Sequence, residues 1–484
     1  MAHDAVVVGS GPNGLAAAIT LALAGRRVLV REAQPTIGGG LRSAELTLPG
    51  YTHDVCAAVH PLAISSPFFA SLPLAPHGLE WIHPDAPLAH PLDGGWAAVL
   101  ERSLADTAAR LDAEEGRDGD AWRRLLGGVA EHWDDLVPVL LAPLTLPKVP
   151  PHPLLLAKFG LQALRSADAM ARGRFRGERA RALFAGSAGH SFLPLTQRPS
   201  AAIGLVLSAA AHAVGWPIAR GGSQRLADAL VSYLRSLGGD VAAGAPVEDI
   251  GELDGVDTVL LDLTPRGVLR IAGERLPPRY REALSRYRLG PGAFKLDWAL
   301  DGPVPWTNPE CLRAATVHVG GTLDEIAAAE GAVGEGKVAE RPFVLLVQPT
   351  IADPSRAPEG KHVVWAYCHV PNGSTVDMSD AIERQIERFA PGFRERVLAR
   401  HVTPPAALER HNANYTGGDI GGGALDLRQT FFRPVARVNP YRTPLAGVWL
   451  CSSATPPGPG VHGMAGHQAA RFALRDGRRG RRRR

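Results

Sequence analysis

Three glycines near the amino terminus have the spacing of a phosphate-binding turn. Gly9, Gly11 and Gly14 form the pattern G-x-G-x-x-G, and Glu32 follows them further along the chain. The first glycine permits a tight turn, the second lets the backbone approach a pyrophosphate, and the third allows close helix packing. An acidic residue at the position of Glu32 accepts hydrogen bonds from ribose hydroxyls. The pattern therefore indicates a dinucleotide-binding segment.

The elements around these glycines are those that such a turn requires. Residues 4–8 (DAVVV) predict a strand, LAAAITLALAG predicts a helix that ends at Gly25, and residues 26–32 (RRVLVRE) predict a second strand. Together they have the length of a parallel crossover unit. The start of the helix directs free backbone N–H groups at the phosphates. We therefore predict an α/β fold that contains a Rossmann-like domain.

Two further glycine-rich segments indicate which dinucleotide is bound. TIGGGLRS (36–43) is a flexible loop with a cation, placed where a pyrophosphate would end. NAD dehydrogenases have no need of such a loop, whereas a cofactor with a ribityl chain and a tricyclic ring does. PPGPGVHG (456–463) lies between a predicted buried strand and a predicted helix, whose N-terminus can face a reduced, anionic flavin. A plain structural turn is the alternative for this last segment. Together the three segments predict FAD.

Several blocks of sequence carry a family resemblance. They are VVVGSGPNGLAAA (6–18), the GGG-x-R loop, YTHDVCAAVHPLAISSPFF (51–69), GGSQRLADAL (221–230), the APVEDI segment and CSSATPPGPGVHGMAGHQAAR (451–471). The chain resembles the bacterial phytoene desaturase group within the amine-oxidase-like flavoprotein superfamily. The resemblance implies a discontinuous FAD-binding domain (1–65, 216–290 and 430–484), a mixed α+β substrate or cap domain (66–215 and 291–429), and hydride transfer from substrate to flavin N5.

The turns and the resemblance together predict the cofactor-binding residues. Val247 matches the position whose backbone holds the adenine in that superfamily, whereas Ser452 and Ser453 stand where many members have an acidic residue. Because NYTGGDIGGG (414–423) lacks the cysteine that attaches flavin in some amine oxidases, we expect noncovalent FAD. The full predicted set is Gly9, Ser10, Gly11, Pro12, Asn13, Gly14, Glu32, Ala33, Gly39, Gly40, Arg42, Val247, Ser453, Gly460, Val461 and His462.

Three residues are candidates for the chemistry itself. Lys295 resembles the lysine that amine oxidases hold against flavin N5 through a water, although a strand lysine that reaches solvent or pairs with Asp297 is the favoured explanation. His462 lies in the last glycine turn, close to the expected ring. His60 precedes a proline and is otherwise a structural turn residue. Flavin chemistry requires few protein groups, so the absence of a catalytic triad does not argue against an enzyme.

Composition and charge indicate which binding partners and which cellular compartment to expect. The formal charge of the chain is +4, but the tail RDGRRGRRRR (475–484) contains seven arginines and one aspartate. The rest of the chain therefore has a formal charge of −2, which does not indicate a nucleic-acid-binding protein. We expect this tail to be disordered. The four cysteines have neither zinc-site nor disulfide spacing, so we expect no metal site and a cytoplasmic protein. The apolar residues 136–165, with Lys148 and Lys158, form either a peripheral membrane contact or a buried wall.

The function that these features predict is an FAD-dependent dehydrogenase, desaturase or oxidase acting on an apolar, isoprenoid-like small molecule. No second nucleotide fingerprint is evident, so electrons should leave to oxygen, a quinone or another protein. One alternative is an amine-oxidase-like enzyme for a polar amine, for which Lys295 is the main support. Another is a lipid-binding or escort protein of the same fold without redox activity. The intact Gly9, Gly11, Gly14 and Glu32 argue against that last alternative.

Overall fold

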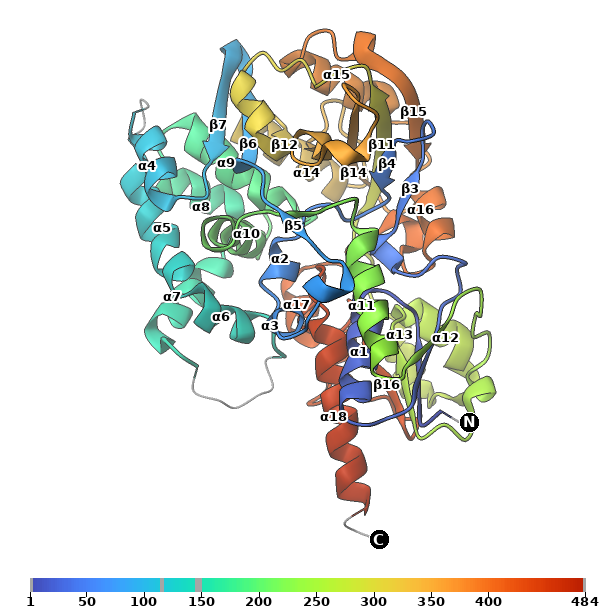
Figure 1. Cartoon of the computed structure of the whole chain (residues 1–484). Helices are drawn as coiled ribbons and strands as arrows, with labels where there is room; N and C mark the ends of the chain where they lie inside the picture. Colours follow the sequence, from blue (N-terminus) through green and yellow to red (C-terminus); the bar gives the residue numbers. More distant parts are fainter. Residues whose placement is uncertain (1–2, 114–116, 144–149, 482–484) are drawn as a thin grey trace.

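The computed structural model describes residues 3–113, 117–143 and 150–481. The chain forms two layered regions, each built on its own sheet, with a bundle of helices beside the larger sheet (Figure 1). The mixed α/β architecture with a Rossmann-like unit confirms the predicted fold class.

The smaller sheet is parallel and has the order β16-β10-β1-β2-β9. Its strands come from the ranges 1–65, 216–290 and 430–484, so the chain leaves this sheet and returns to it. The central strand has the sequence AVVV and is buried on both faces, which is typical of parallel sheets covered by helices. The strands are β1 (Ala5–Val8), β2 (Val28–Arg31), β9 (Asp240–Ala242), β10 (Thr258–Leu261) and β16 (Val448–Leu450).

Helices cover both faces of this sheet. Ala5 and Val7 face one group, α1 (Pro12–Leu23), α11 (Gln224–Ser236) and α18 (Met464–Arg481). Val6 and Val8 face the other, α12 (Pro265–Ala272) and α13 (Pro278–Ser285). Helix α1 begins with Pro12, whose missing N–H costs nothing in the first turn, and is followed by Gly25 with a φ of 77°. The two ends of this crossover helix are thus encoded locally.

The larger sheet is mixed and has the order β15-β11-β14-β13-β12-β6-β7. One face packs on the amphipathic helix α15 (Ser379–Phe389), and the other faces the helices of residues 104–213. The strands are β6 (Ala86–Leu92), β7 (Trp96–Leu100), β11 (Gly292–Leu300), β12 (Ala314–Val319), β13 (Val344–Val347), β14 (His362–Val370) and β15 (Val397–Thr403).

The helical bundle lies on the left of Figure 1, beside the larger sheet. It comprises α4 (Leu104–Asp112), α5 (Gly119–Glu131), α6 (Trp133–Leu140), α7 (Pro153–Ala163), α8 (Ala167–Arg174), α9 (Glu178–Gly189) and α10 (Ala201–Ala213). The remaining helices are α2 (Pro61–Ile64), α3 (Pro67–Ala70), α14 (Leu323–Gly334), α16 (Pro405–His411) and α17 (Leu427–Phe432). Short paired strands are β3 (Ser43–Glu45) with β4 (Thr52–Asp54), and β5 (Trp81–Ile82) with β8 (Ile218–Ala219).

The carboxyl-terminal segment differs from its sequence-based prediction. Disorder was expected from residue 475, but α18 continues to Arg481 and projects from the body at the bottom of Figure 1. The helix begins directly after the turn at residues 456–463 and packs along α1, so the tail extends a helix that tertiary contacts have already nucleated. Residues 482–484 of the predicted tail lie outside the described residues.

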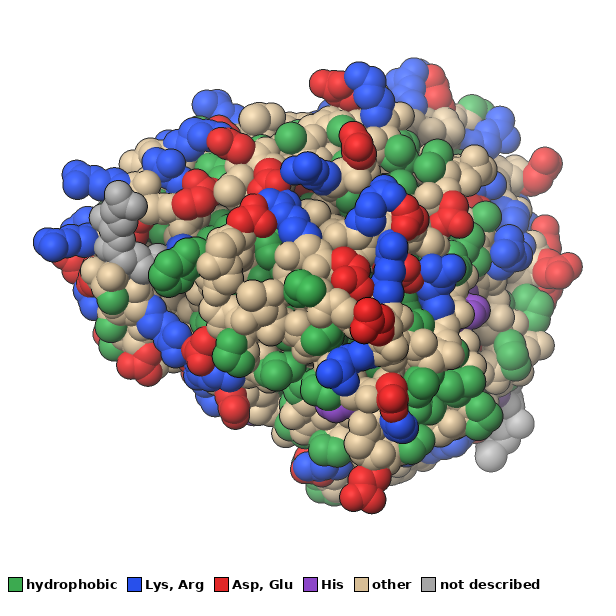
Figure 2. Space-filling view, turned by 90° about the horizontal axis from the view of Figure 1, so that it is seen from above, with side chains coloured by type: hydrophobic (Ala, Val, Ile, Leu, Met, Phe, Trp, Pro, Cys, Tyr) green, Lys and Arg blue, Asp and Glu red, His purple; other side chains and the backbone are tan. Residues whose placement is uncertain are grey.

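The surface is polar and mixed in charge. Lysine and arginine side chains are interspersed with aspartate and glutamate over the face in Figure 2, with scattered apolar side chains between them. None of the described helices combines the length and the apolar character that crossing a bilayer demands.

Candidate functional site

A cavity of about 420 Å³ lies between the two sheets. Its lining combines the turn after β1, the loop after β2, the ends of β10 and β16, helix α10, and strands β12, β13 and β14. The three glycine-rich turns, far apart in sequence, all contribute to this lining. One continuous space therefore runs from the Rossmann-like sheet to the larger sheet.

The close packing of the first turn explains its glycines. Gly9 has a φ of 103°, a region that L side chains rarely adopt. A Cβ on Gly14 would lie 2.1 Å from the carbonyl oxygen of Gly9, and one on Gly39 would lie 3.0 Å from the Cα of Gly11. The first turn, its helix and the GGG-x-R loop are therefore in backbone contact, as a cradle for an extended phosphate group requires.

Glu32 is held at the edge of the cavity by hydrogen bonds from both sides. Its Oε2 accepts from the backbone N–H of Ser10 at 2.9 Å and from the Ser10 hydroxyl at 2.6 Å. Its Oε1 accepts from the backbone N–H of Gln34 at 2.9 Å and from the Arg42 guanidinium at 3.2 Å. These four hydrogen bonds fix the orientation of the carboxylate at the edge of the cavity.

Arg42 also lines the cavity and is almost fully buried. Besides Glu32, its guanidinium donates to the backbone oxygens of Thr36 at 2.8 Å and His411 at 2.9 Å. Burial lowers the pKa of this guanidinium, while the Glu32 carboxylate acts in the opposite direction. An arginine remains charged under these conditions. Arg42 therefore presents a fixed cation beside the first turn.

Asp262, at the end of β10, is a site residue that the sequence reasoning missed. Its Oδ2 accepts the backbone N–H of Gly14 at 3.0 Å, and a Cβ on Gly11 would lie 2.8 Å from the same oxygen. Burial raises the pKa of this carboxyl to about 7, and the nearby Glu32 charge raises it further. The available signal was an acid directly after the apolar run TVLL, at the carboxyl end of a parallel strand.

The start of α1 also offers an unused polar atom. Asn13 is buried and lines the cavity, and its Oδ1 has no hydrogen-bond partner among the described residues. Buried polar atoms are rarely left unsatisfied in native proteins. This atom and the glycine cradle are the two structural observations that fit a bound dinucleotide here.

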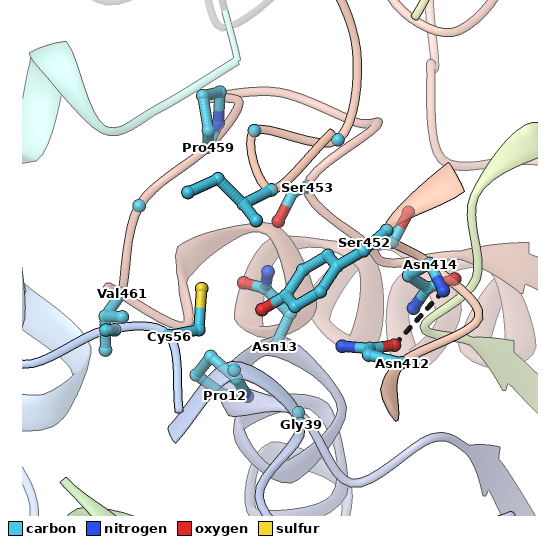
Figure 3. A pocket seen from close by; sticks show the side chains of 18 of the residues that line it. Pro12, Asn13, Gly39, Cys56, Asn412, Asn414, Ser452, Ser453, Pro459 and Val461 are labelled. Atoms are coloured by element: carbon cyan, nitrogen blue, oxygen red, sulfur yellow. Dashed lines mark hydrogen bonds between the residues drawn. The ribbon is translucent and has the colours of Figure 1, made fainter. Parts of the chain in front are cut away.

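The last glycine turn, residues 456–463, contributes another part of the cavity wall. Ser453, Gly460 and Val461 line the cavity as predicted residues, and the Cys56 thiol faces them from the loop after β4 (Figure 3). Burial raises the pKa of the Cys56 thiol, which keeps it protonated. Asn412 and Asn414 lie at the side of the cavity, where Asn412 Oδ1 accepts the Asn414 N–H at 3.1 Å (Figure 3).

Most predicted cofactor residues meet at this cavity, but two lie behind its surface. Gly14 and His462 are absent from the described lining. Gly14 instead packs the helix onto the turn. The lining residues of the predicted set are Gly9, Ser10, Gly11, Pro12, Asn13, Glu32, Ala33, Gly39, Gly40, Arg42, Val247, Ser453, Gly460 and Val461.

Lys295 is buried beneath the cavity and paired with Asp297. Its Nζ donates to Asp297 Oδ1 at 2.5 Å and lies 5.2 Å from the ring centroid of Trp365. The lysine borders a small separate pocket with Cys56 and Tyr367, not the main cavity. The structure thus places Lys295 in the paired arrangement that the sequence reasoning weighed against a catalytic role.

The two candidate histidines have different surroundings. His462 is buried, its Nδ1 accepts the Met464 N–H at 3.0 Å, and its carbonyl accepts the Ser66 hydroxyl at 2.6 Å. Its ring therefore caps α18. His60 lines the cavity with its Nε2 2.8 Å from the Ser223 hydroxyl, and burial lowers its pKa to about 4. His60 is consequently a neutral wall residue at physiological pH.

The half of the cavity toward the larger sheet is mainly apolar. Its walls come from α10 and from the cavity-facing residues of β12, β13 and β14, a set that the sequence reasoning did not single out. These lining residues are Ile203, Val206, Leu207, Thr316, Leu345, Val347, Trp365 and Tyr367, with His190, Phe192 and Trp216 beside them. The arrangement suits an apolar molecule that lies against a planar cofactor.

Comparisons with known proteins agree with this geometry. The family model of the NAD(P)-binding Rossmann-like domain matches residues 7–70. A rat protein, pyridine nucleotide-disulfide oxidoreductase domain-containing protein 2, is 27% identical over 98% of this chain and 94% of its own length. The neurosporene-forming phytoene desaturase of Rhodobacter capsulatus is 24% identical over 51% of each chain.

Solved structures resemble the whole chain. An oxidoreductase from Methanosarcina mazei superposes with a TM-score of 0.65 at 17% identity, covering 97% of this chain and 99% of the other. A putrescine oxidase variant gives a TM-score of 0.60 at 17% identity and covers 98% of both chains. In sequence the chain is thus similar to a phytoene desaturase over half its length, and its fold is similar to that of a putrescine oxidase.

The two ends of the cavity differ in character. The Rossmann-like sheet presents glycine turns, Glu32 and Arg42 at one end. The larger sheet closes the other end with apolar and aromatic side chains. The polar end and the apolar end of the cavity therefore belong to different layers of one fold.

Proposed function

We propose that this flavin-type oxidoreductase binds FAD noncovalently and oxidises an apolar, isoprenoid-like small molecule by hydride transfer to flavin N5. The single observation that supports this proposal is the continuous cavity, whose polar end lies in the glycine turns and whose apolar end lies against the larger sheet. FAD would supply the hydride acceptor, because none of the side chains around the cavity can accept a hydride.

The chain's own residues contribute binding, orientation and exclusion of water. Glu32 would hold the ribose, and the donors around Gly11 and Asn13 would face the pyrophosphate. Val247 would lie against the adenine, and Ser453 with Val461 against the ring end. The leucine, valine and isoleucine side chains of α10 and β13 would orient the substrate and keep water out, which strengthens electrostatic interactions within the site.

An absorption spectrum of the purified protein tests the cofactor and its redox competence together. We expect flavin bands that bleach with dithionite, and FAD that is released by denaturation, as noncovalent binding requires. Glu32→Ala should lower the flavin content, because it removes the ribose acceptor, whereas Glu274→Ala, an exposed acid of the same region, should not. Full flavin occupancy in the Glu32 variant would contradict the ribose assignment.

The oxidation of a polar, positively charged amine is less well supported. The acidic residues in the described lining are Glu32 and Asp262, and both lie in the dinucleotide half. A buried ammonium needs an opposite charge, and the half next to the larger sheet offers none among the described residues. Peroxide detection with a panel of amines and apolar alcohols would separate the two substrate classes. Reduction of an added quinone under anaerobic conditions, followed by the loss of quinone absorbance, tests the electron acceptor.

We also propose a peripheral contact with lipid through α7. Leu154 and Leu161 are 86% and 72% exposed, and Lys158 is exposed between them. Their spacing places them on one helix face, and a lysine beside exposed leucines fits an anionic membrane surface. Cosedimentation with anionic phospholipid vesicles should fall for Leu154→Ser/Leu161→Ser and not for Leu398→Ser on β15, another exposed leucine. Lys148, predicted to share this surface, lies outside the described residues.

A further inference from the structure

The substrate half of the cavity contains polar atoms that protein groups leave unused. Thr316 on β12 and Trp365 on β14 both line the cavity and are 3% and 5% exposed. Thr316 Oγ1 and Trp365 Nε1 have no hydrogen-bond partner among the residues that the structure describes. An unsatisfied buried hydroxyl or indole N–H costs free energy, so each such atom in a native protein requires an explanation.

Sheet register brings these two side chains to one face. Thr316 lies opposite Val347, and Val347 lies opposite Trp365, so the three residues form one row across β12, β13 and β14. Neighbouring strands are about 4.8 Å apart, which puts the ends of the row within the length of a small ligand. The row therefore presents a hydroxyl and an indole N–H on either side of an apolar residue.

A histidine adds a third polar group to this part of the cavity. His190, at the end of α9, lines the cavity, and its Nε2 lies 2.9 Å from Nε2 of the fully buried His318. Burial lowers the pKa of His190 to about 3, so its ring is neutral. The bond to His318 orients the ring and leaves its Nδ1 for another partner.

The chemistry of the three groups selects the ligand. An indole N–H only donates, so the atom that it binds must be an acceptor. An ammonium ion has no acceptor, and a hydrocarbon has no hydrogen-bonding atom at all. A hydroxyl or carbonyl oxygen can accept from Trp365, and Thr316 and His190 can each donate or accept in turn.

We propose that Thr316 Oγ1, Trp365 Nε1 and His190 Nδ1 line a polar subsite that binds an uncharged, oxygen-bearing part of the substrate. The substrate is accordingly an apolar molecule that carries a hydroxyl or carbonyl, and it is neither a pure hydrocarbon nor a cationic amine. This inference rests on the proposed function, because it names the substrate class of the same cavity.

Binding of three matched probes to the purified holoprotein tests the subsite. Octanol, octane and octylammonium share one chain length and differ in the polar group, and calorimetry measures their binding independently of the flavin. We expect octanol to bind at least about tenfold more tightly than octane, and octylammonium to bind more weakly than octanol. The variant Thr316→Val removes the hydroxyl at nearly constant shape and should weaken octanol binding about fivefold, which corresponds to one hydrogen bond of about 1 kcal/mol.

Two controls separate binding from folding. Because the Thr316 hydroxyl has no protein partner, Thr316→Val should melt at the same or a higher temperature than the wild type and should bind octane unchanged. Ser208→Ala removes another buried hydroxyl without a described partner, on α10 outside the lining, and should change neither probe's affinity. Trp365→Phe should repeat the selective loss of octanol binding.

Either of two results overturns the inference. One is equal affinity for octanol and octane in the wild type, and the other is unchanged octanol affinity in both Thr316→Val and Trp365→Phe. The proposed function fails separately, if the wild type purifies without FAD or its flavin does not bleach. Because calorimetry does not depend on flavin, selective octanol binding would still be measured in that case.

Discussion

Replacing Asp262 by asparagine tests whether ionisation of this carboxyl, which contacts the start of α1, makes the stability of the protein depend on pH. Asparagine keeps the shape and can still accept the Gly14 N–H through its oxygen, but it cannot ionise. Burial raises the pKa of Asp262 from 3.8 to about 7. The folded protein therefore binds this proton more tightly than the unfolded chain does. The free energy of unfolding must then fall as pH rises from about 4 to about 7, and it levels off above that range.

The size of the effect follows from the shift. One pKa unit corresponds to about 1.4 kcal/mol, so the wild type should lose up to about 3 kcal/mol between pH 5 and pH 7 relative to Asp262→Asn. Thermal melting of both proteins without cofactor, from pH 5 to pH 7, measures the difference between their stabilities. The other titrating groups are common to both proteins, so their contributions cancel in this difference. Asp257→Asn, at the opposite end of β10 and exposed, is the matched control and should follow the wild type. Parallel melting curves for wild type and Asp262→Asn would refute the reasoning.

The same carboxyl should make cofactor retention depend on pH. A pyrophosphate beside Gly11 would lie close to Asp262, and an ionised carboxylate there repels it. We expect the dissociation constant for FAD to rise above pH 7, by up to about tenfold per pH unit, since one proton is linked to binding. Ultrafiltration of the holoprotein from pH 6 to pH 9 measures the released flavin. In Asp262→Asn the rise should be absent.

Three further substitutions have defined outcomes. Gly14→Ala would place a Cβ 2.1 Å from the Gly9 oxygen, so we expect loss of flavin from whatever folded protein is recovered, as read from its absorption spectrum. Lys295→Met leaves the buried Asp297 carboxylate without its cation and should destabilise the fold by about 3–5 kcal/mol in denaturant melts, with recovery in Lys295→Met/Asp297→Asn. His462→Ala removes the cap of α18 and should lower the free energy of unfolding by about 1 kcal/mol, while the bound flavin can still be reduced. Loss of flavin reduction at unchanged stability would instead assign the His462 ring a chemical role.

The dinucleotide half could be predicted from sequence because its signals are local. Gly9 and Gly14 lie within one turn and one helix start, and their spacing has a steric reason that holds in any chain. Glu32 follows at the end of the next strand, so its position relative to the turn is set by the length of a single crossover.

The substrate half could not be predicted in the same way. Thr316, Trp365 and His190 come from three segments separated by long stretches of chain, and only sheet register and helix packing bring them together. Each is unremarkable in its own stretch of sequence. The role of Lys295 was also undecided, because the sequence offers Asp297 as a partner but does not show whether the lysine pairs with it or reaches the main cavity.

Local patterns were thus enough to predict the Rossmann-like unit and most of the residues that line its end of the cavity, since the backbone conformation of each turn depends on a few adjacent residues. Tertiary structure alone decided which face of the larger sheet looks into the cavity and that Asp262 meets Gly14. The physical reason is that burial and hydrogen-bond partnership depend on segments distant in sequence. A carboxyl or hydroxyl acquires its shifted pKa or its unused hydrogen bond only when those segments pack around it.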